Sequence, residues 1–224
     1  MLTLMIATPI IFLLPRPEIR GEDLPLMMFE NLLSNSTSAY FLYPQNMGSL
    51  DYQSAKNISN ALTNHSLTEL YYQPGDPFVD SDGCPKPEAI PPGECIILVG
   101  GPSTQACVKY YEVTKQAPLI VKLRGGNVWW ETRNGEIADE TLTALANLDS
   151  HHDIFIVEFF KDRHHRNILI CYGLNWQGTL LAGQYFSQVV YPKISDYEEP
   201  YYILKWVDSN NDASPTIDEV VEIL

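Results

Sequence analysis

The chain has 224 residues, of which 14 are basic and 28 are acidic, and its formal net charge at pH 7 is -14. A surface of this charge repels nucleic acid and anionic lipid headgroups, so we exclude nucleic acid as a partner and expect cations to bind instead. Hydrophobic residues make up 45% of the sequence, which is enough to build a buried core and excludes a largely disordered chain.

We interpret residues 1–17 as a separate apolar segment and residues 18–224 as a single α/β domain. Residues 2–14 form an apolar run that is shorter than the roughly 20 residues a helix needs to cross a bilayer. Pro9 interrupts this run and Pro15 follows it, so no long helix passes through. Three interpretations stay open: the remnant of an export signal or anchor, a core strand, or a segment that inserts into a neighbouring subunit. Membrane association is expected through this segment if it occurs.

The pattern becomes regular at residue 39. Residues 39–43 predict a buried strand, and Asp51 is placed to cap a helix over residues 52–62. Residues 73–95 are rich in Pro, Gly and Asp and have no apolar period, which predicts the longest loop of the chain.

The next apolar run leads directly into a glycine turn. Residues 95–99 are all apolar, Gly100-Gly101-Pro102-Ser103 follows, and residues 104–111 have a helical pattern. A strand that enters a helix through such a turn is typical of a parallel sheet covered by helices.

Three further strands are predicted at residues 119–123, 154–160 and 167–172, with a short helix at 139–148. The polar residues 161–166 between the last two strands indicate a hairpin, so the sheet is expected to be mixed.

A second strand, turn and helix unit follows. The turn at residues 173–179 leads into a helix at 180–190 that ends before Pro192, and residues 201–207 form the final strand. Together these elements predict an α/β fold of three layers, with a mixed but mostly parallel sheet of flavodoxin-like type.

The cysteines suggest an oxidising environment. Cys84 and Cys95 enclose a short loop rich in Pro and Gly, and we predict a disulfide between them in an exported chain. For Cys107 and Cys171 two interpretations stay open, namely buried free thiols or a second disulfide.

Three glycosylation sequons begin at Asn35, Asn57 and Asn64. Each suits an exposed site in an exported protein. Only 19% of the residues are charged, while 13 are Tyr and 16 are Pro, and this weakly charged composition favours an extracellular, cell-surface location.

The sharpest local pattern is residues 208–219, where amide or carboxylate side chains stand at positions 1, 3 and 5 and a Glu at position 12. This spacing matches an EF-hand loop, although Ala213 stands where that loop has glycine. We predict a calcium site with these ligands: Asp208, Asn210, Asp212, Ser214, Thr216 and Glu219. The alternative is an Asx-rich turn that caps a helix at residues 217–224.

Catalytic patterns are absent from the sequence. It has no Gly-x-Ser-x-Gly or His-Glu-x-x-His motif and no Cys and His in a recognisable catalytic context, so we expect no enzyme. The pairs His151-His152 and His164-His165 flank a predicted strand whose ends are separated by about 20 Å, which is too far for a shared metal ion.

Three stretches together resemble archaeal surface-layer (S-layer) proteins and related secreted envelope proteins: IILVGGP at residues 96–102, YGLNWQGT at 172–179 and YYILKWVD at 201–208. The resemblance covers residues 39–224. It implies a non-catalytic structural protein of the cell surface that associates with itself or with other envelope proteins. Two alternatives stay open: a filament-forming or partner-binding extracellular module, into whose partner residues 2–14 insert, and a secreted enzyme.

Overall fold

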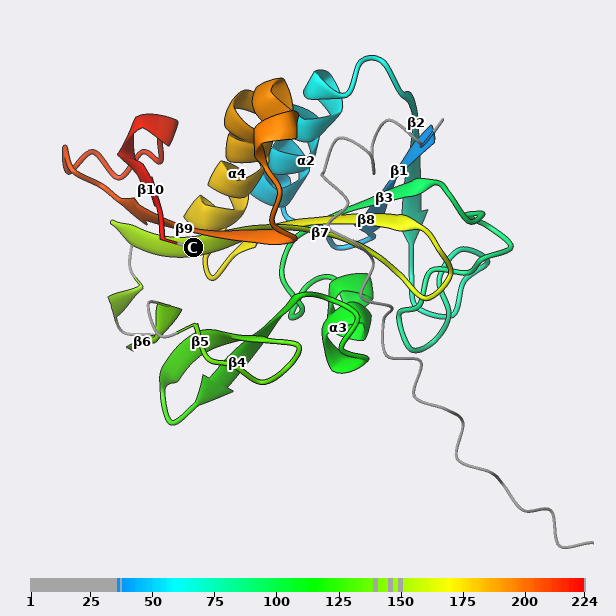
Figure 1. Cartoon of the computed structure of the whole chain (residues 1–224), viewed down its shortest axis with the longest axis horizontal. Coiled ribbons are helices and arrows are strands. Elements are labelled where there is room, and N and C mark those ends of the chain that lie inside the picture. The colour runs from blue at the N-terminus through cyan, green and yellow to red at the C-terminus, as the bar shows by residue number, and fades with distance from the viewer. Residues whose placement is uncertain (1–35, 37, 139–140, 145–146, 149–150, 224) are drawn as a thin grey trace, which may run out of the picture.

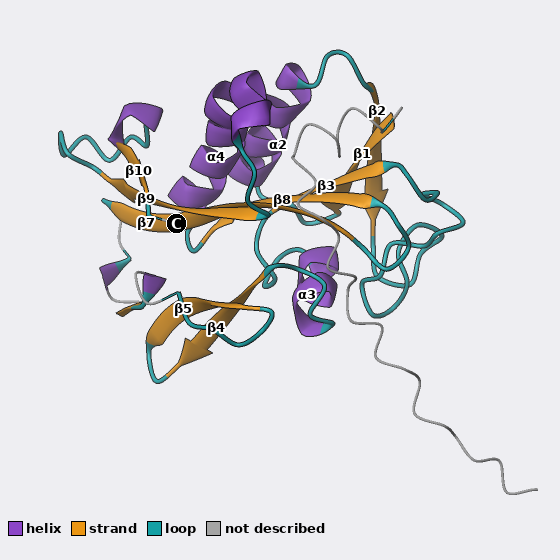
Figure 2. Cartoon of the chain, in the orientation of Figure 1, coloured by secondary structure: helices purple, strands orange, loops and turns teal. Residues whose placement is uncertain are grey.

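The computed structural model describes residues 36, 38–138, 141–144, 147–148 and 151–223. These residues form an α/β fold with three layers, in which a seven-stranded sheet lies between two helices on one face and a helix with a small three-stranded sheet on the other (Figures 1 and 2). The apolar segment 1–17 and the Asn35 sequon lie outside the described residues.

The central sheet has the strand order β10-β9-β7-β8-β3-β1-β2. Its strands are β1 (Ser38–Pro44), β2 (Ser66–Tyr72), β3 (Cys95–Val99), β7 (His152–Lys161), β8 (Asn167–Gly173), β9 (Tyr201–Val207) and β10 (Val220–Glu222). The small sheet contains β4 (Leu119–Arg124), β5 (Asn127–Thr132) and β6 (Thr143–Ala144).

The sheet is mixed, as the hairpin pattern predicted, but the prediction of a mostly parallel sheet was wrong. The pairs β1·β2, β1·β3 and β3·β8 are parallel, whereas β7·β8, β7·β9 and β9·β10 are antiparallel, as are both pairs of the small sheet. The short connection between β7 and β8 allows only an antiparallel pair, and β9 and β10 then continue from β7.

Helices α2 (Ser49–Ala61) and α4 (Trp176–Tyr185) cover one face of the sheet, and α3 (Ala106–Val113) covers the other (Figure 2). A π-helical turn, η3 (Phe186–Val190), and a 3-10 segment, η4 (Tyr191–Asp196), continue α4. Pro192 lies in the first turn of η4, so the regular helix ends near the predicted position.

Both faces of the central strands are buried. Along β3, Cys95, Ile97 and Val99 pack against α2 and α4, while Ile96 and Leu98 pack against α3. A strand covered on both faces needs apolar residues at every position, which explains its unbroken apolar run.

Two predicted helices do not form. Residues 143–144, inside the predicted helix at 139–148, form β6 and pair with β5. Instead of a helix at 217–224, the chain makes a short 3-10 turn, η5 (Ile217–Glu219), and then the edge strand β10. Pairing with a neighbouring strand outweighs the local helical tendency in both segments.

The predicted disulfide between Cys84 and Cys95 is wrong. All four cysteines are buried free thiols. Cys95 belongs to the core beneath α2 and α4, whereas Cys84 belongs to the core beneath α3. The central sheet therefore separates two residues that are close in sequence.

Candidate functional site

The predicted calcium loop connects β9 to β10 and ends in η5. Two of its residues, Asn211 and Ala213, have positive φ angles of 59° and 56°. The left-handed conformation at Ala213 is the one that favours glycine, and it stands at the position where an EF-hand loop has glycine. The chain therefore turns at the expected point although the residue is alanine.

Side chains at alternate positions hold this turn together. Asp208 accepts backbone N–H groups of Asp212 at 3.2 Å, through Oδ1, and of Ala213 at 2.8 Å, through Oδ2. The Oδ1 atom of Asn210 accepts the N–H of Asp212 at 2.9 Å, and Oδ1 of Asp212 accepts that of Ser214 at 2.8 Å. The loop thus curls around the side chains at its positions 1, 3 and 5.

Glu219 closes the loop from its far end. Its Oε1 atom accepts hydrogen bonds from the N–H of Ser209 at 2.9 Å and from the hydroxyl of Ser209 at 2.8 Å. Its Oε2 atom accepts from Nε1 of Trp206 at 3.1 Å and from the hydroxyl of Thr216 at 3.2 Å. The bonds from Ser209 and Trp206 lower the pKa of Glu219, so this carboxylate is ionised at neutral pH.

His151 is a residue of this site that the sequence did not reveal. Its Nδ1 atom lies 2.5 Å from Oδ2 of Asp208, and its carbonyl accepts the N–H of Asp208 at 2.9 Å. Burial acts to raise the pKa of Asp208, but the hydrogen bonds from His151 and from the loop backbone prevail and lower it. His152 and Val207 form an antiparallel pair, and His151 and Asp208 are the next residues beyond it, so they lie opposite each other.

The donor atoms of the loop suit a hard cation. All six predicted ligands offer oxygen, which calcium prefers, and residues 208–223 contain five carboxylates and no Lys or Arg. Within the described residues, no three His, Cys, Asp or Glu side chains gather as a metal-binding group. The loop carboxylates instead accept N–H and O–H groups, with which a calcium ion would have to compete.

A second polar cluster lies between the central sheet and α3. The Tyr172 hydroxyl donates to Oε1 of Glu112 at 2.6 Å, and Nε1 of Trp130 donates to the same hydroxyl at 3.1 Å. The backbone N–H of Val121 donates to Oε2 of Glu112 at 3.2 Å. One hydrogen-bond network, centred on Glu112 and Tyr172, therefore joins the four elements β8, α3, β5 and β4.

Glu158 on β7 adds a second buried carboxyl group to this interface. Its Oε2 atom accepts the N–H of Leu119 at 3.1 Å, while its Oε1 atom is buried without a hydrogen-bond partner. Burial raises the pKa of Glu112 to about 7. Burial and the neighbouring Glu112 raise the pKa of Glu158 well above its usual value, which favours its protonated form.

Two cavities lie near the glycine turn after β3. One of about 400 Å³ borders Glu112 and is also lined by Lys109, Lys115 and Lys122. Each oxygen of Glu112 accepts one hydrogen bond from the protein, so the carboxyl group is held in place by Tyr172 and by the backbone of Val121. The other, of about 450 Å³, lies where β1 and β2 end, and its lining contains no carboxylate, imidazole or thiol.

The glycines of the second turn have a packing role. A Cβ atom on Gly173 would lie 2.5 Å from Cα of Gly178, and one on Gly178 would lie 2.6 Å from Oδ2 of Asp153. Asp153 is fully buried and accepts the N–H of Gly178 at 2.6 Å and that of Asn175 at 3.1 Å. The turn therefore fits the backbone around a buried carboxylate that caps α4.

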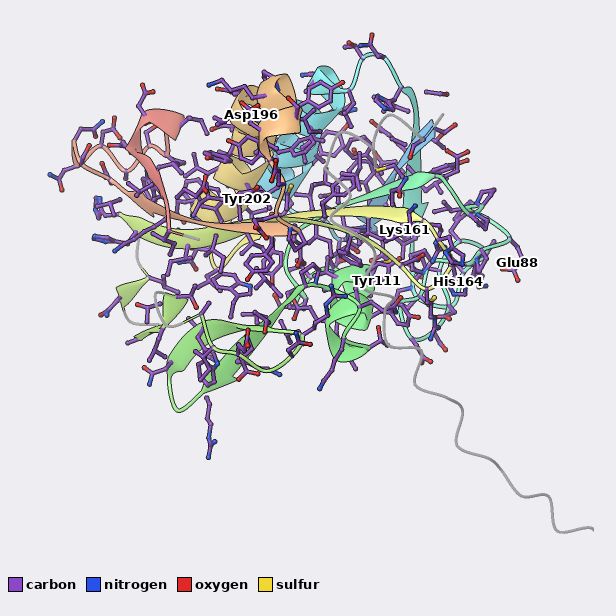
Figure 3. All side chains as sticks on the ribbon, in the orientation of Figure 1. Glu88, Tyr111, Lys161, His164, Asp196 and Tyr202 are labelled. Carbon is purple, nitrogen blue, oxygen red and sulfur yellow. The ribbon has the colours of Figure 1, made fainter. Side chains whose placement is uncertain are left out.

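The other predicted residues are spread over the molecule. Asn64 is exposed in the turn between α2 and β2, whereas Nδ2 of Asn57, the atom that would carry a glycan, is buried on α2. His164 lies beside Glu88 at one end of the sheet (Figure 3), and the β9–β10 loop lies at the opposite end (Figure 1). The structure does not bring these residues together.

No protein-family profile matches this chain, and no curated protein matches it either. In the described part of the chain, every helix is too short or too polar to span a bilayer.

Proposed function

We propose that this chain is a non-catalytic structural protein of an extracellular cell surface, similar to S-layer proteins, in which calcium stabilises the loop between β9 and β10. The observation that carries the proposal is an oxygen-rich loop, residues 208–219, with four carboxylates and no Lys or Arg, placed at an edge of the central sheet. The resemblance of the three sequence stretches to S-layer proteins supports the same class.

Calcium would be held by side-chain oxygens of the six predicted ligands Asp208, Asn210, Asp212, Ser214, Thr216 and Glu219. The ion would offset the repulsion among carboxylates that no cationic side chain of the loop neutralises. Strand β10 pairs with β9 over three residues, so it depends on the loop for its position. Calcium binding would therefore fix an edge of the sheet.

The parallel half of the sheet supports a flavodoxin-like interpretation. Strands β2, β1, β3 and β8 are adjacent and parallel in this order, which corresponds to the first four positions of the order 2-1-3-4-5. The likeness concerns the arrangement of strands, and in our proposal it carries no flavin-dependent activity.

The free edge at β2 supports association between molecules. In the described residues β2 pairs with β1 alone, and its outer side presents backbone groups that another strand could pair with. Tyr71 on β2 is 54% exposed and lies 5.2 Å, between ring centroids, from Tyr43 on β1. This edge favours a second copy or another envelope protein as the partner, and it equally suits the alternative of a filament-forming or partner-binding module.

Thermal unfolding in calcium and in a chelator tests the proposal. We expect calcium to stabilise the folded chain by about 2.7 kcal/mol when the free ion is a hundredfold above the dissociation constant. Asp212→Ala should abolish this difference. Asp82→Ala, in the acidic loop before β3, is the matched control and should retain it. Identical melting curves with and without calcium would remove the site, and electron microscopy of the calcium-loaded protein would show whether it assembles.

A further inference from the structure

The central sheet divides the four buried cysteines into two pairs. Cys95 and Cys171 belong to the core beneath α2 and α4, and Cys84 and Cys107 belong to the core beneath α3. A disulfide joins Cα atoms that are about 4.4–6.8 Å apart, so it cannot pass through the sheet. The four pairings that cross the sheet are therefore excluded.

The pair beneath α2 and α4 is also too far apart. In the parallel register of β3 and β8, Cys95 is opposite Asn167 and Cys171 is opposite Val99. The two cysteines are thus displaced by four residues along the strands, which corresponds to about 13 Å. Only the pair Cys84 and Cys107 is left.

The backbones next to Cys84 and Cys107 are in direct contact. A Cβ atom on Gly83 would lie 2.4 Å from the carbonyl oxygen of Ala106 and 3.4 Å from Cβ of Ala106. Each of these residues immediately precedes one of the two cysteines. The absence of a side chain at Gly83 allows the loop that carries Cys84 to lie against the first turn of α3.

Hydrogen bonds fix the loop in this position. Oδ1 of Asp80 accepts the N–H of Cys84 at 2.8 Å, and a guanidinium nitrogen of Arg166 donates to the carbonyl of Pro85 at 2.7 Å. Arg166 is fully buried and also bonds to Asp162 at the end of β7. The Cys84 segment is therefore held by a bond within its own loop and by one from Arg166, which directly precedes β8.

The two thiols also share their surroundings. The Tyr72 hydroxyl accepts the N–H of Cys107 at 3.4 Å. Burial raises the pKa of the Cys107 thiol to about 12, and Cys84 is close enough to contribute to this rise. Both thiols are buried in the folded chain, so an oxidant would have to reach them before the loop packs onto α3.

We propose that Cys84 and Cys107 form a disulfide when the chain folds in an oxidising compartment, and that this bond fastens the long loop between β2 and β3 to α3. The oxidant is a low-molecular-weight disulfide such as oxidised glutathione. Two S–H bonds of the protein break and one S–S bond forms, while the disulfide of the oxidant is cleaved and its two sulfur atoms take up the two electrons and two protons. The inference depends on the cysteine positions alone and stands apart from calcium binding and assembly.

Refolding of the full chain in a buffer of reduced and oxidised glutathione, followed by peptide mapping without reduction, tests this pairing. We expect one linked peptide pair that contains Cys84 and Cys107, a mass lower by two hydrogen atoms, and two remaining thiols at Cys95 and Cys171. The oxidised protein should melt at a temperature higher by about 5–10 °C than the reduced protein.

The matched variants separate this pair from the other two cysteines. The double variant Cys95→Ser and Cys171→Ser should keep the linked peptides, and Cys84→Ser should lose them. Because the mapping is done on the unaltered chain, a variant that fails to fold does not affect the main result. Four titratable thiols after oxidative refolding, or links that include Cys95 or Cys171, would overturn the inference.

Discussion

The hydroxyl of Tyr172 on β8 lies 2.6 Å from Oε1 of Glu112 on α3, and this hydrogen bond joins the central sheet to the layer beneath it. Trp130 on β5 donates to the same hydroxyl, so the small sheet is attached at the same point. The carboxyl group of Glu158 is buried in the same interface, and burial together with the charge of Glu112 raises its pKa. Because burial outweighs the hydrogen bonds that favour the ionised form of Glu112, the folded state favours the protonated carboxyl group.

Glu112→Gln should make the stability of the protein less dependent on pH. The pKa of Glu112 is raised from 4.5 to about 7 in the folded state. The folded state therefore holds the proton more tightly than the unfolded state, so stability is highest below about pH 4.5 and declines as the pH rises to 7. This difference corresponds to about 3 kcal/mol. Glutamine stays neutral and can still accept the bond from Tyr172.

Urea unfolding of both proteins at pH 5 and pH 8 measures the effect. We expect the variant to lose about 2–3 kcal/mol less stability between these two pH values than the unaltered protein does. Glu88→Gln, at an exposed position of the loop before β3, should leave the pH dependence unchanged. Equal pH slopes for Glu112→Gln and the unaltered protein would contradict the buried carboxyl interpretation.

Asp153→Ala should destabilise the fold through the start of α4. The carboxylate is fully buried and accepts N–H groups of Asn175 and Gly178, which alanine would leave unpaired. The free energy of unfolding should decrease by about 2–4 kcal/mol. Asp82→Ala removes an exposed loop carboxylate and should change the free energy of unfolding by less than about 0.5 kcal/mol. Denaturant unfolding at pH 7.5 compares the two variants. Equal losses in the free energy of unfolding would show that Asp153 does not cap α4.

Tyr71→Lys should weaken association between copies of the chain. A charge on the exposed edge strand opposes pairing with another strand, and losing the aromatic ring removes apolar contact area. We expect the dissociation constant, measured by sedimentation velocity, to rise about tenfold. Val113→Lys alters a residue of α3 that is 72% exposed, and this control should leave the dissociation constant unchanged. A chain that stays monomeric at all concentrations would contradict association through β2.

Much of the central sheet could be predicted from the sequence. The run Cys95–Val99 is a strand in the structure with the same bounds as predicted, and the strand at 201–207 is equally well placed. These segments are rich in aliphatic and aromatic residues and are bounded by polar or turn residues, so their local pattern is sufficient. Strand β2 was missed because Ser66–Tyr72 mixes polar and aromatic residues at an edge, where only one side is paired.

In the candidate site, too, some residues could be predicted from the local sequence and others could not. The oxygen-bearing residues of the C-terminal loop are contiguous, so their spacing could be interpreted directly. His151 precedes Asp208 by 57 positions, and nothing in either local sequence indicates that they meet. Glu112 and Glu158 are likewise ordinary acidic residues until the fold buries both of them.

The residue pattern was enough to establish the α/β class, the positions of the apolar strands and the composition of the acidic loop, because these depend on neighbours within one segment. Only the folded arrangement decided which strands beyond the β7–β8 hairpin are antiparallel, which cysteines share a face of the sheet, and which carboxyl groups are buried together. Those features depend on contacts between segments far apart along the chain, and such contacts arise when the two faces of the sheet are covered.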